Sequence, residues 1–207
     1  MDARMKWWAL DKRYKEKLID KHRYACVDYE WWDCTHENFK EQMKEIGVHA
    51  EEIYFSGFYS QGDGACFDGR VADWPKFLEA AGKPDLIAHA VEHGLCLSWA
   101  SKGRYSHSGS VSFHDSDLWI DNPHDKDDDP LRYAAWEALN PGVGGPVLAH
   151  SDTFEEFIKG KMDKLYKDLE AEYDYLTSDE TIIDYLLEYR EDEINGGLDE
   201  QQEQALA

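Results

Sequence analysis

Long apolar runs are missing from this chain of 207 residues. A membrane-spanning helix needs about 20 consecutive apolar residues, and no run approaches that length. No signal peptide precedes the first charged residues. Cysteine is also sparse, and the four thiols form no C-x-x-C pair: Cys26, Cys34, Cys66 and Cys96. The pattern predicts free thiols in a reducing cytosol and argues against membrane insertion, a disulfide framework or a zinc knuckle.

Basic side chains are half as numerous as acidic ones. The sequence has 22 Lys and Arg against 44 Asp and Glu, which gives a formal net charge of −22. Contacts with nucleic-acid phosphates need Lys and Arg, so we do not expect direct nucleic-acid binding. A basic partner is expected instead, including a protein whose own ligand is a nucleic acid. The alternative is that the acidity only keeps the protein soluble.

Signatures of common enzyme scaffolds are absent as well. The chain contains no Walker A motif, no Rossmann glycine pattern, no H-E-x-x-H and no G-x-S-x-G. We therefore expect no bound cofactor and lean against enzymatic activity.

The most informative stretch that is present is residues 53–69, where two apolar, aromatic runs flank a polar turn. Gly62 and Gly64 allow the positive φ of tight turns, and Asp63 between them can bond to its own backbone. Gly57 in the first run indicates a bulge or a close backbone approach. The pattern predicts a β-hairpin with polar residues at its tip.

Flanking segments add helices and further strands. Helices are expected at 29–46, 73–81, 84–93, 131–139 and 153–176, and strands at 95–101, 110–114 and 118–120. In the last of these helices, Phe154, Ile158, Leu165 and Leu169 follow a helical period and should face the core. The expected fold class is α+β: an antiparallel sheet built around a central hairpin, packed against several helices that include a long C-terminal helical hairpin.

We expect a single α+β domain over residues 1–190, with residues 151–190 as its helical C-terminal part. The Gly/Pro-rich segment 140–146 is the best candidate boundary. The C-terminal end lacks apolar periodicity and is interrupted by Asn195-Gly196-Gly197. Residues 191–207 are therefore predicted to form an acidic, disordered tail.

Residues 55–67 resemble the F-S-G-F-x-S-Q-G-D-G-A-x-F signature of an uncharacterised family of bacteriophage and prophage proteins. Members of that family are sometimes labelled antitoxins of toxin–antitoxin systems. Residues 103–109 and 169–180 fit the same family and fall in the same order. The resemblance implies an origin in a phage or mobile element, and hence the host cytosol, but it implies no activity and no catalytic residues.

Polar side chains in two of these signature segments are candidates for a binding site. They are Ser60, Gln61, Asp63, Arg104, Tyr105, His107 and Ser108. If both turns lie at the same end of the sheet, they form one polar patch with an aromatic floor. The alternative is that Gln61, Asp63 and Ser108 only satisfy turn amides and that His107 bonds a carbonyl.

A small cysteine-dependent hydrolase using Cys66 and His107 is the alternative function. Asp63 to Cys66 faintly resembles the Asp-Gly-x-Cys turn of ovarian-tumour-type cysteine proteases. A thiolate nucleophile would need His107 as its base, with Gln61 or turn amides stabilising the oxyanion. On a strand, however, a cysteine is more often a small buried hydrophobe.

A metal site is not expected. The candidate ligands are His107, His114, Asp115 and Asp117, and the alternating Asp125, Asp127 and Asp129. Pro130 stands where a calcium-binding EF-hand loop needs glycine, and Trp136 stands where it needs glutamate. The acidic loop is therefore interpreted as solvated.

Charge is distributed unequally between the two ends of the chain. Residues 1–24 carry eight basic against four acidic side chains, whereas residues 168–207 carry fourteen acids against Arg190 alone. The ends should therefore attract each other. The acidic surface is assigned to Asp168, Glu172, Asp174, Asp179, Glu180, Asp184, Glu188, Glu191, Asp192 and Glu193.

The leading hypothesis from these features is a phage-derived binding protein. It would inhibit or redirect a host protein, such as a nucleic-acid-binding defence component, by presenting an acidic surface that mimics nucleic acid. The competing interpretation is that the basic residues of segment 1–24 neutralise the acidic rows and that the rows serve the fold.

Overall fold

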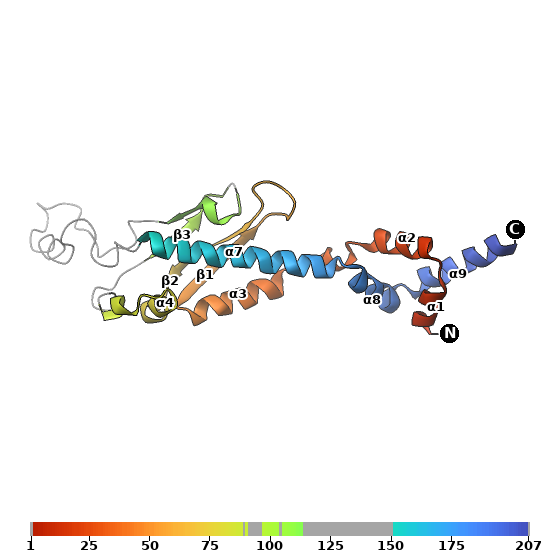
Figure 1. Cartoon of the computed structure of the whole chain (residues 1–207), viewed down its shortest axis with the longest axis horizontal. Helices are drawn as coiled ribbons and strands as arrows, with labels where there is room; N and C mark the ends of the chain where they lie inside the picture. Colours follow the sequence, from red (N-terminus) through yellow and green to blue (C-terminus); the bar gives the residue numbers. More distant parts are fainter. Residues whose placement is uncertain (1, 89, 91–96, 104, 114–150, 207) are drawn as a thin grey trace, which may run out of the picture. The chain divides into compact units, whose positions relative to one another are not determined.

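The computed structural model describes residues 2–88, 90, 97–103, 105–113 and 151–206. Within it the chain divides into two compact units instead of one domain with a tail. The first unit combines Met1–Cys34 with Leu169–Ala207, and the second comprises Thr35–Asp168. Helices accompany one antiparallel sheet, which confirms the α+β class (Figure 1).

The sheet of the second unit has four antiparallel strands in the order β1-β2-β3-β4. They are β1 (Val48–Phe55), β2 (Ala65–Val71), β3 (Ser98–Ser101) and β4 (Val111–Phe113). The predicted hairpin is β1-β2, whose pairing runs from Val48 with Val71 to Phe55 with Ala65. Its register shifts between Ala50 and Ile53, so the irregularity expected at Gly57 lies earlier in the strand.

Aromatic side chains join the helices of the second unit to the sheet or to one another. These helices are α3 (Asp33–Glu45), α4 (Trp74–Ala80) and α7 (Ser151–Leu176), with short 3₁₀ turns η2 (Pro84–Leu86) and η3 (Ser108–Ser110). Phe39 of α3 meets Phe67 of β2 edge-to-face at 5.1 Å between ring centroids, and Phe67 meets Trp99 of β3 at 5.5 Å. Phe77 of α4 contacts Phe154 of α7 at 5.4 Å. Rings thus carry much of the core, as the aromatic composition predicts.

The core stripe predicted for the long helix is confirmed. The side chains of Phe154, Ile158, Leu165 and Leu169 are fully buried in α7. At about 25 cal/mol per Å² of apolar surface, each contributes about 1.5–3 kcal/mol to the burial free energy. Among the described residues, no helix is both long and apolar enough to cross a membrane.

Gly47 ends α3 and turns the chain into β1. Its φ of 78° is one that side-chain-bearing residues rarely adopt. A Cβ there would lie 2.9 Å from the Phe77 amide nitrogen, and the Gly47 carbonyl accepts hydrogen bonds from Ala72 and Asp73. Glycine at this position therefore allows the backbone at the start of α4 to pack directly against the end of α3.

The first unit is entirely helical in its described part. It contains α1 (Ala3–Ala9), α2 (Lys12–His22), η1 (Ala25–Val27), the end of α7, α8 (Asp179–Tyr189) and α9 (Glu191–Leu206). Its core consists of Trp7, Leu10, Leu18, Ile19, Ile182, Leu186 and Ile194. The two adjacent tryptophans have different surroundings: Trp7 is 2% exposed and belongs to the core, whereas Trp8 is 72% exposed.

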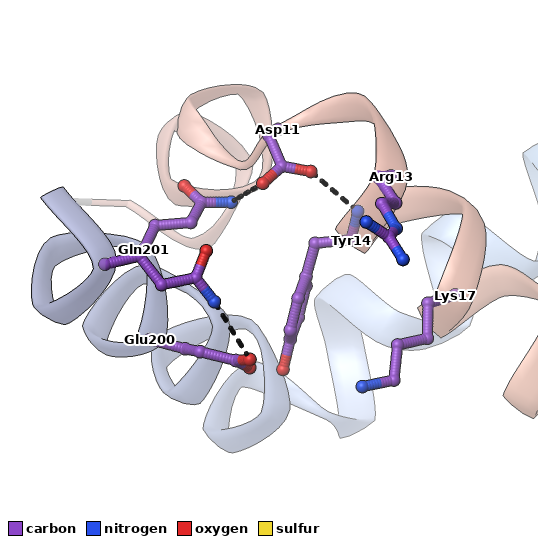
Figure 2. A pocket seen from close by; sticks show the side chains of 7 residues that line it. Asp11, Arg13, Tyr14, Lys17, Glu200 and Gln201 are labelled. Atoms are coloured by element: carbon purple, nitrogen blue, oxygen red, sulfur yellow. Dashed lines mark hydrogen bonds between the residues drawn. The ribbon is translucent and has the colours of Figure 1, made fainter.

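The predicted disordered tail is corrected by α9. Ile194 of this helix is fully buried, and Gly197 is buried against Tyr14 of α2. Figure 2 shows the adjoining contact, in which Gln201 donates to Asp11 Oδ2 at 3.0 Å. The two glycines predicted a break in the helix, but α9 continues through them, and Gly197 allows α2 to pack closely against α9.

Several predicted features lie outside the described residues. These are Cys96, Arg104, the helix at 131–139, the strand at 118–120, the boundary at 140–146 and the acidic loop 121–130.

Candidate functional site

The two signature turns lie against each other at one end of the sheet, as the hypothesis of a composite patch requires. A Cβ on Gly64 would lie 2.5 Å from His107 Cβ and 3.0 Å from the Ser106 carbonyl oxygen. A Cβ on Gly62 would lie 3.8 Å from Tyr105 Cδ1. Figure 1 shows the orange hairpin loop and the green loop before β4 at the same end. The two glycines differ in role, because Gly62 has a φ of 98° whereas Gly64 provides the close approach.

Asp63 is used inside the hairpin turn. Its Oδ2 accepts hydrogen bonds from the amides of Tyr59 at 3.0 Å and Ser60 at 2.6 Å. Its own amide donates to the Ser60 carbonyl at 3.1 Å. The carboxylate therefore organises the turn, whereas the side chains of Ser60 and Gln61 are exposed at its tip.

His107 is likewise part of the local scaffold. Its carbonyl accepts the Ser110 amide at 2.8 Å at the end of η3, and the Ser110 hydroxyl accepts the His107 amide at 3.2 Å. The same hydroxyl is within donating distance of the Tyr105 and His107 carbonyls. The His107 ring stacks on Tyr105, with centroids 6.0 Å apart and planes 23° apart. These contacts hold Tyr105, which is half exposed, at the surface.

Cys66 lies beneath this patch and is fully buried. Burial raises the pKa of the Cys66 thiol, and hydrogen bonding to Ser101 and Ser110 offsets that rise only in part. A raised pKa keeps the thiol protonated at neutral pH, whereas a nucleophile must be a thiolate. The protonated thiol and the stacking of the His107 ring on Tyr105 both argue against the hydrolase alternative.

Sequence reasoning overlooked two further features of this end. Asp68 of β2 ties the sheet together, because Oδ1 accepts the Ser101 amide at 2.7 Å and Oδ2 accepts the Tyr54 hydroxyl at 3.2 Å. Tyr59 is 80% exposed beside the hairpin tip. The apolar run that contains Tyr54 and Tyr59 predicted a strand, and it carried no signal that these tyrosines face solvent.

Four of the ten acidic candidates are paired within their own unit. Glu191 accepts from Lys6 Nζ and Glu193 from Lys21 Nζ, each at 2.6 Å, while Asp179 pairs with Arg23. On α7, Asp168 pairs with Lys164 one turn away. The attraction expected between the chain ends is therefore present in the first unit.

Glu193 is the most connected of the paired carboxylates. The hydrogen bond from Lys21 lowers the pKa of Glu193, and His22 Nε2 lies 3.1 Å from both of its carboxylate oxygens. His22 is buried, so this cluster joins α2 to the start of α9.

The α8 acidic row, which we define as Glu180, Asp184 and Glu188, is different. All three side chains are exposed and lie four residues apart, so they line one face of α8 over about 12 Å. In the described part of the chain, no Lys or Arg lies within ion-pair distance of any of them. Glu172, Asp174 and Asp192 also have no such ion pair among the described residues.

Metal ligands do not converge in what the structure describes. No three His, Cys, Asp or Glu side chains there are placed to hold an ion. His114, Asp115, Asp117, Asp125, Asp127 and Asp129 lie outside the described residues.

Comparison with known proteins gives one family. Neither the curated proteins nor the solved structures contain a match. The family described as a domain of unknown function, DUF8835, matches residues 31–179. This segment contains the sheet and both signature turns and ends at the first residue of α8, so the whole α8 acidic row lies beyond it. Because the match covers well over half of its length, the chain belongs to the DUF8835 family.

Proposed function

We propose that this chain is a phage-derived, non-catalytic binding protein that inhibits or redirects a basic host protein through the α8 acidic row. The observation that carries the proposal is that Glu180, Asp184 and Glu188 are exposed without a paired cation among the described residues. The phage signature supports the origin, and the burial of Cys66 argues against the catalytic alternative.

The arrangement of ion pairs favours this proposal over a purely structural role for the row. The basic N-terminal segment does neutralise carboxylates, but those are Asp179, Glu191 and Glu193. Like charges four residues apart on a helix cost about 0.2–0.5 kcal/mol per pair. A row that the fold leaves unneutralised concentrates negative potential, which attracts a basic partner and speeds its association.

Host nucleic-acid-binding proteins are the partner class that this field suits best, because their binding surfaces carry the Lys and Arg that contact phosphate. The proposed counter-defence role would consist of occupying such a surface. Binding of this kind should weaken steeply with salt and should compete with DNA or RNA.

The experiment compares two charge reversals of equal size. A partner captured from host lysate on the wild-type chain is titrated against E180K/D184K/E188K and against D199K/E200K/E203K, which reverses three exposed acids of α9. The row variant should lose at least about tenfold in affinity, equivalent to about 1.4 kcal/mol, with an unchanged melting temperature. The α9 variant should bind within about threefold of wild type.

Two results would overturn the proposal. Lost stability with unchanged affinity for the row variant would mean that the row serves the fold. Equal loss of affinity in both variants would mean that only net charge matters.

A further inference from the structure

A hollow of about 320 Å³ opens beside the α8 acidic row in the first unit. Its apolar lining comes from Trp7 and Trp8 of α1 and from Ile183 and Leu187 of α8. Glu180 and Asp184 of the acidic row also line it, together with Arg4. We call this hollow the α1–α8 groove.

Trp8 is the unusual side chain of the groove. Trp7 belongs to the core, but Trp8 is 72% exposed. Lys15 Nζ donates to the Trp8 carbonyl at 3.2 Å and lies 5.2 Å from its ring centroid, which is cation–π distance. A large indole is thus held at the surface, and exposed tryptophans are enriched where proteins bind each other.

The surface of α8 explains why the groove is apolar on one side and acidic on the other. At 100° per residue, Ile182 and Leu186 point into the core, and Ile183 and Leu187 follow on the next arc of the helix. Ile183 and Leu187 remain half-buried. The acidic row comes directly after them around the helix, so an apolar strip is bordered by carboxylates.

Size and charge define what the groove accepts. A volume near 320 Å³ is at the small end of the roughly 300–1,000 Å³ typical of ligand pockets, which suits one large side chain of a partner. Two exposed carboxylates against Arg4 leave a net negative lining, so cations beside the inserted side chain are favoured.

We propose that the α1–α8 groove binds a basic segment of a partner protein that inserts one large apolar side chain against Trp8 and Leu187. Lys or Arg residues flanking that side chain pair with Glu180 and Asp184. The inference rests on the proposed function and deepens it, because it adds a specific apolar anchor to an otherwise electrostatic attraction. Charge gives association rate, and a buried anchor gives residence time.

Two synthetic helical peptides of equal charge test the groove on the full chain. One is a lysine-rich 14-residue peptide with leucine and one tryptophan along a single face, and the other has alanine at those apolar positions. Fluorescence anisotropy should show at least tenfold tighter binding of the anchored peptide. Trp8→Ala should abolish that difference, and its circular dichroism and melting temperature should match wild type because the ring is exposed.

Charge variants separate this inference from the proposed function. Arg4→Ala should tighten binding of both peptides severalfold, because it removes the positive charge that lines the groove beside Glu180 and Asp184, and E180K/D184K/E188K should weaken both. One result would refute the groove proposal and leave the proposed function standing. In that result the two peptides bind equally, Trp8→Ala changes nothing, and the row variant still weakens binding. If the row variant binds both peptides as tightly as wild type does, the idea of a basic partner is refuted, and with it both the proposed function and the groove proposal.

A second copy of the chain is the competing occupant of the groove. Sedimentation velocity of wild type and Trp8→Ala decides this point. A concentration-dependent dimer that disappears in Trp8→Ala would overturn the proposal, whereas monomers in both samples agree with it.

Discussion

Tyr14 packs its ring onto the backbone of Gly197, so that a Cβ at residue 197 would lie within 2.7 Å of ring atoms Cδ1 and Cζ. This contact joins α2 to α9 and places glycine where a helix would ordinarily favour alanine. Ile194, three residues earlier on the same face of α9, is fully buried as well.

Gly197→Ala should therefore destabilise the first unit even though alanine is the better helix former. The Cβ would displace the Tyr14 ring, and overpacking of this kind costs about 1–3 kcal/mol. Gly196→Ala is the matched control, since nothing lies within 4 Å of a Cβ there. It should raise the free energy of unfolding by about 0.5–1 kcal/mol. Urea unfolding followed by circular dichroism measures both, and equal effects would contradict the contact.

Gly64→Ala should separate the two signature turns. Its Cβ would lie 2.5 Å from His107 Cβ, so the loop before η3 would have to move, with an expected cost of about 1–3 kcal/mol. Gly57→Ala is the control, because its Cβ would lie no closer than 3.4 Å to the Asp63 carboxylate, which is ordinary van der Waals contact. The control should change stability by less than about 1 kcal/mol in the same urea titration. A tolerated Gly64→Ala would show that the turns are not packed together.

Acid should weaken the α2–α9 junction through Glu193. The pKa of Glu193 is lowered in the folded protein, first by the hydrogen bond from Lys21, so the stabilisation is complete above the ordinary carboxylate pKa of about 4.3. It is lost as the pH falls through the lower, folded value. Glu193→Gln should therefore make the melting temperature depend less on pH below about 5. The variant loses one titrating group, so unfolding should take up at most roughly one proton fewer in this range.

Asp199→Asn serves as the control for this pH dependence, because it removes an exposed carboxylate from the same helix. This variant should follow the wild-type pH curve. If Glu193→Gln also follows that curve, the Lys21–Glu193 bond contributes nothing to folding.

Cys66 should be nearly inert to alkylation while Cys34 reacts. Cys34 is exposed, whereas Cys66 is buried and its thiol pKa is raised by that burial. Iodoacetamide labelling at pH 7.5 with peptide mapping should find modified Cys34 within minutes and Cys66 only in urea. Cys66→Ala should keep the binding activity of wild type. Rapid labelling of native Cys66 would revive the hydrolase alternative.

Local patterns in the sequence sufficed for the hairpin and for the α7 core stripe. Turn residues and apolar periods act over a few positions. Gly62 therefore predicts a turn, and the apolar residues at helical spacing from Phe154 onward predict a buried helix face, without information from the rest of the chain. The charge asymmetry of the two ends likewise predicted their attraction.

Only the tertiary structure decided which residues at the ends and turns are committed to the fold. Ion pairs that join α1 and α2 to α8 and α9 separate the neutralised Asp179, Glu191 and Glu193 from the neighbouring acidic row, although composition treats all of them alike. The same holds for Trp7 against Trp8 and for Gly197 against Gly196. Each pair is adjacent in sequence, but its members face different surroundings, and those surroundings come from segments far away along the chain.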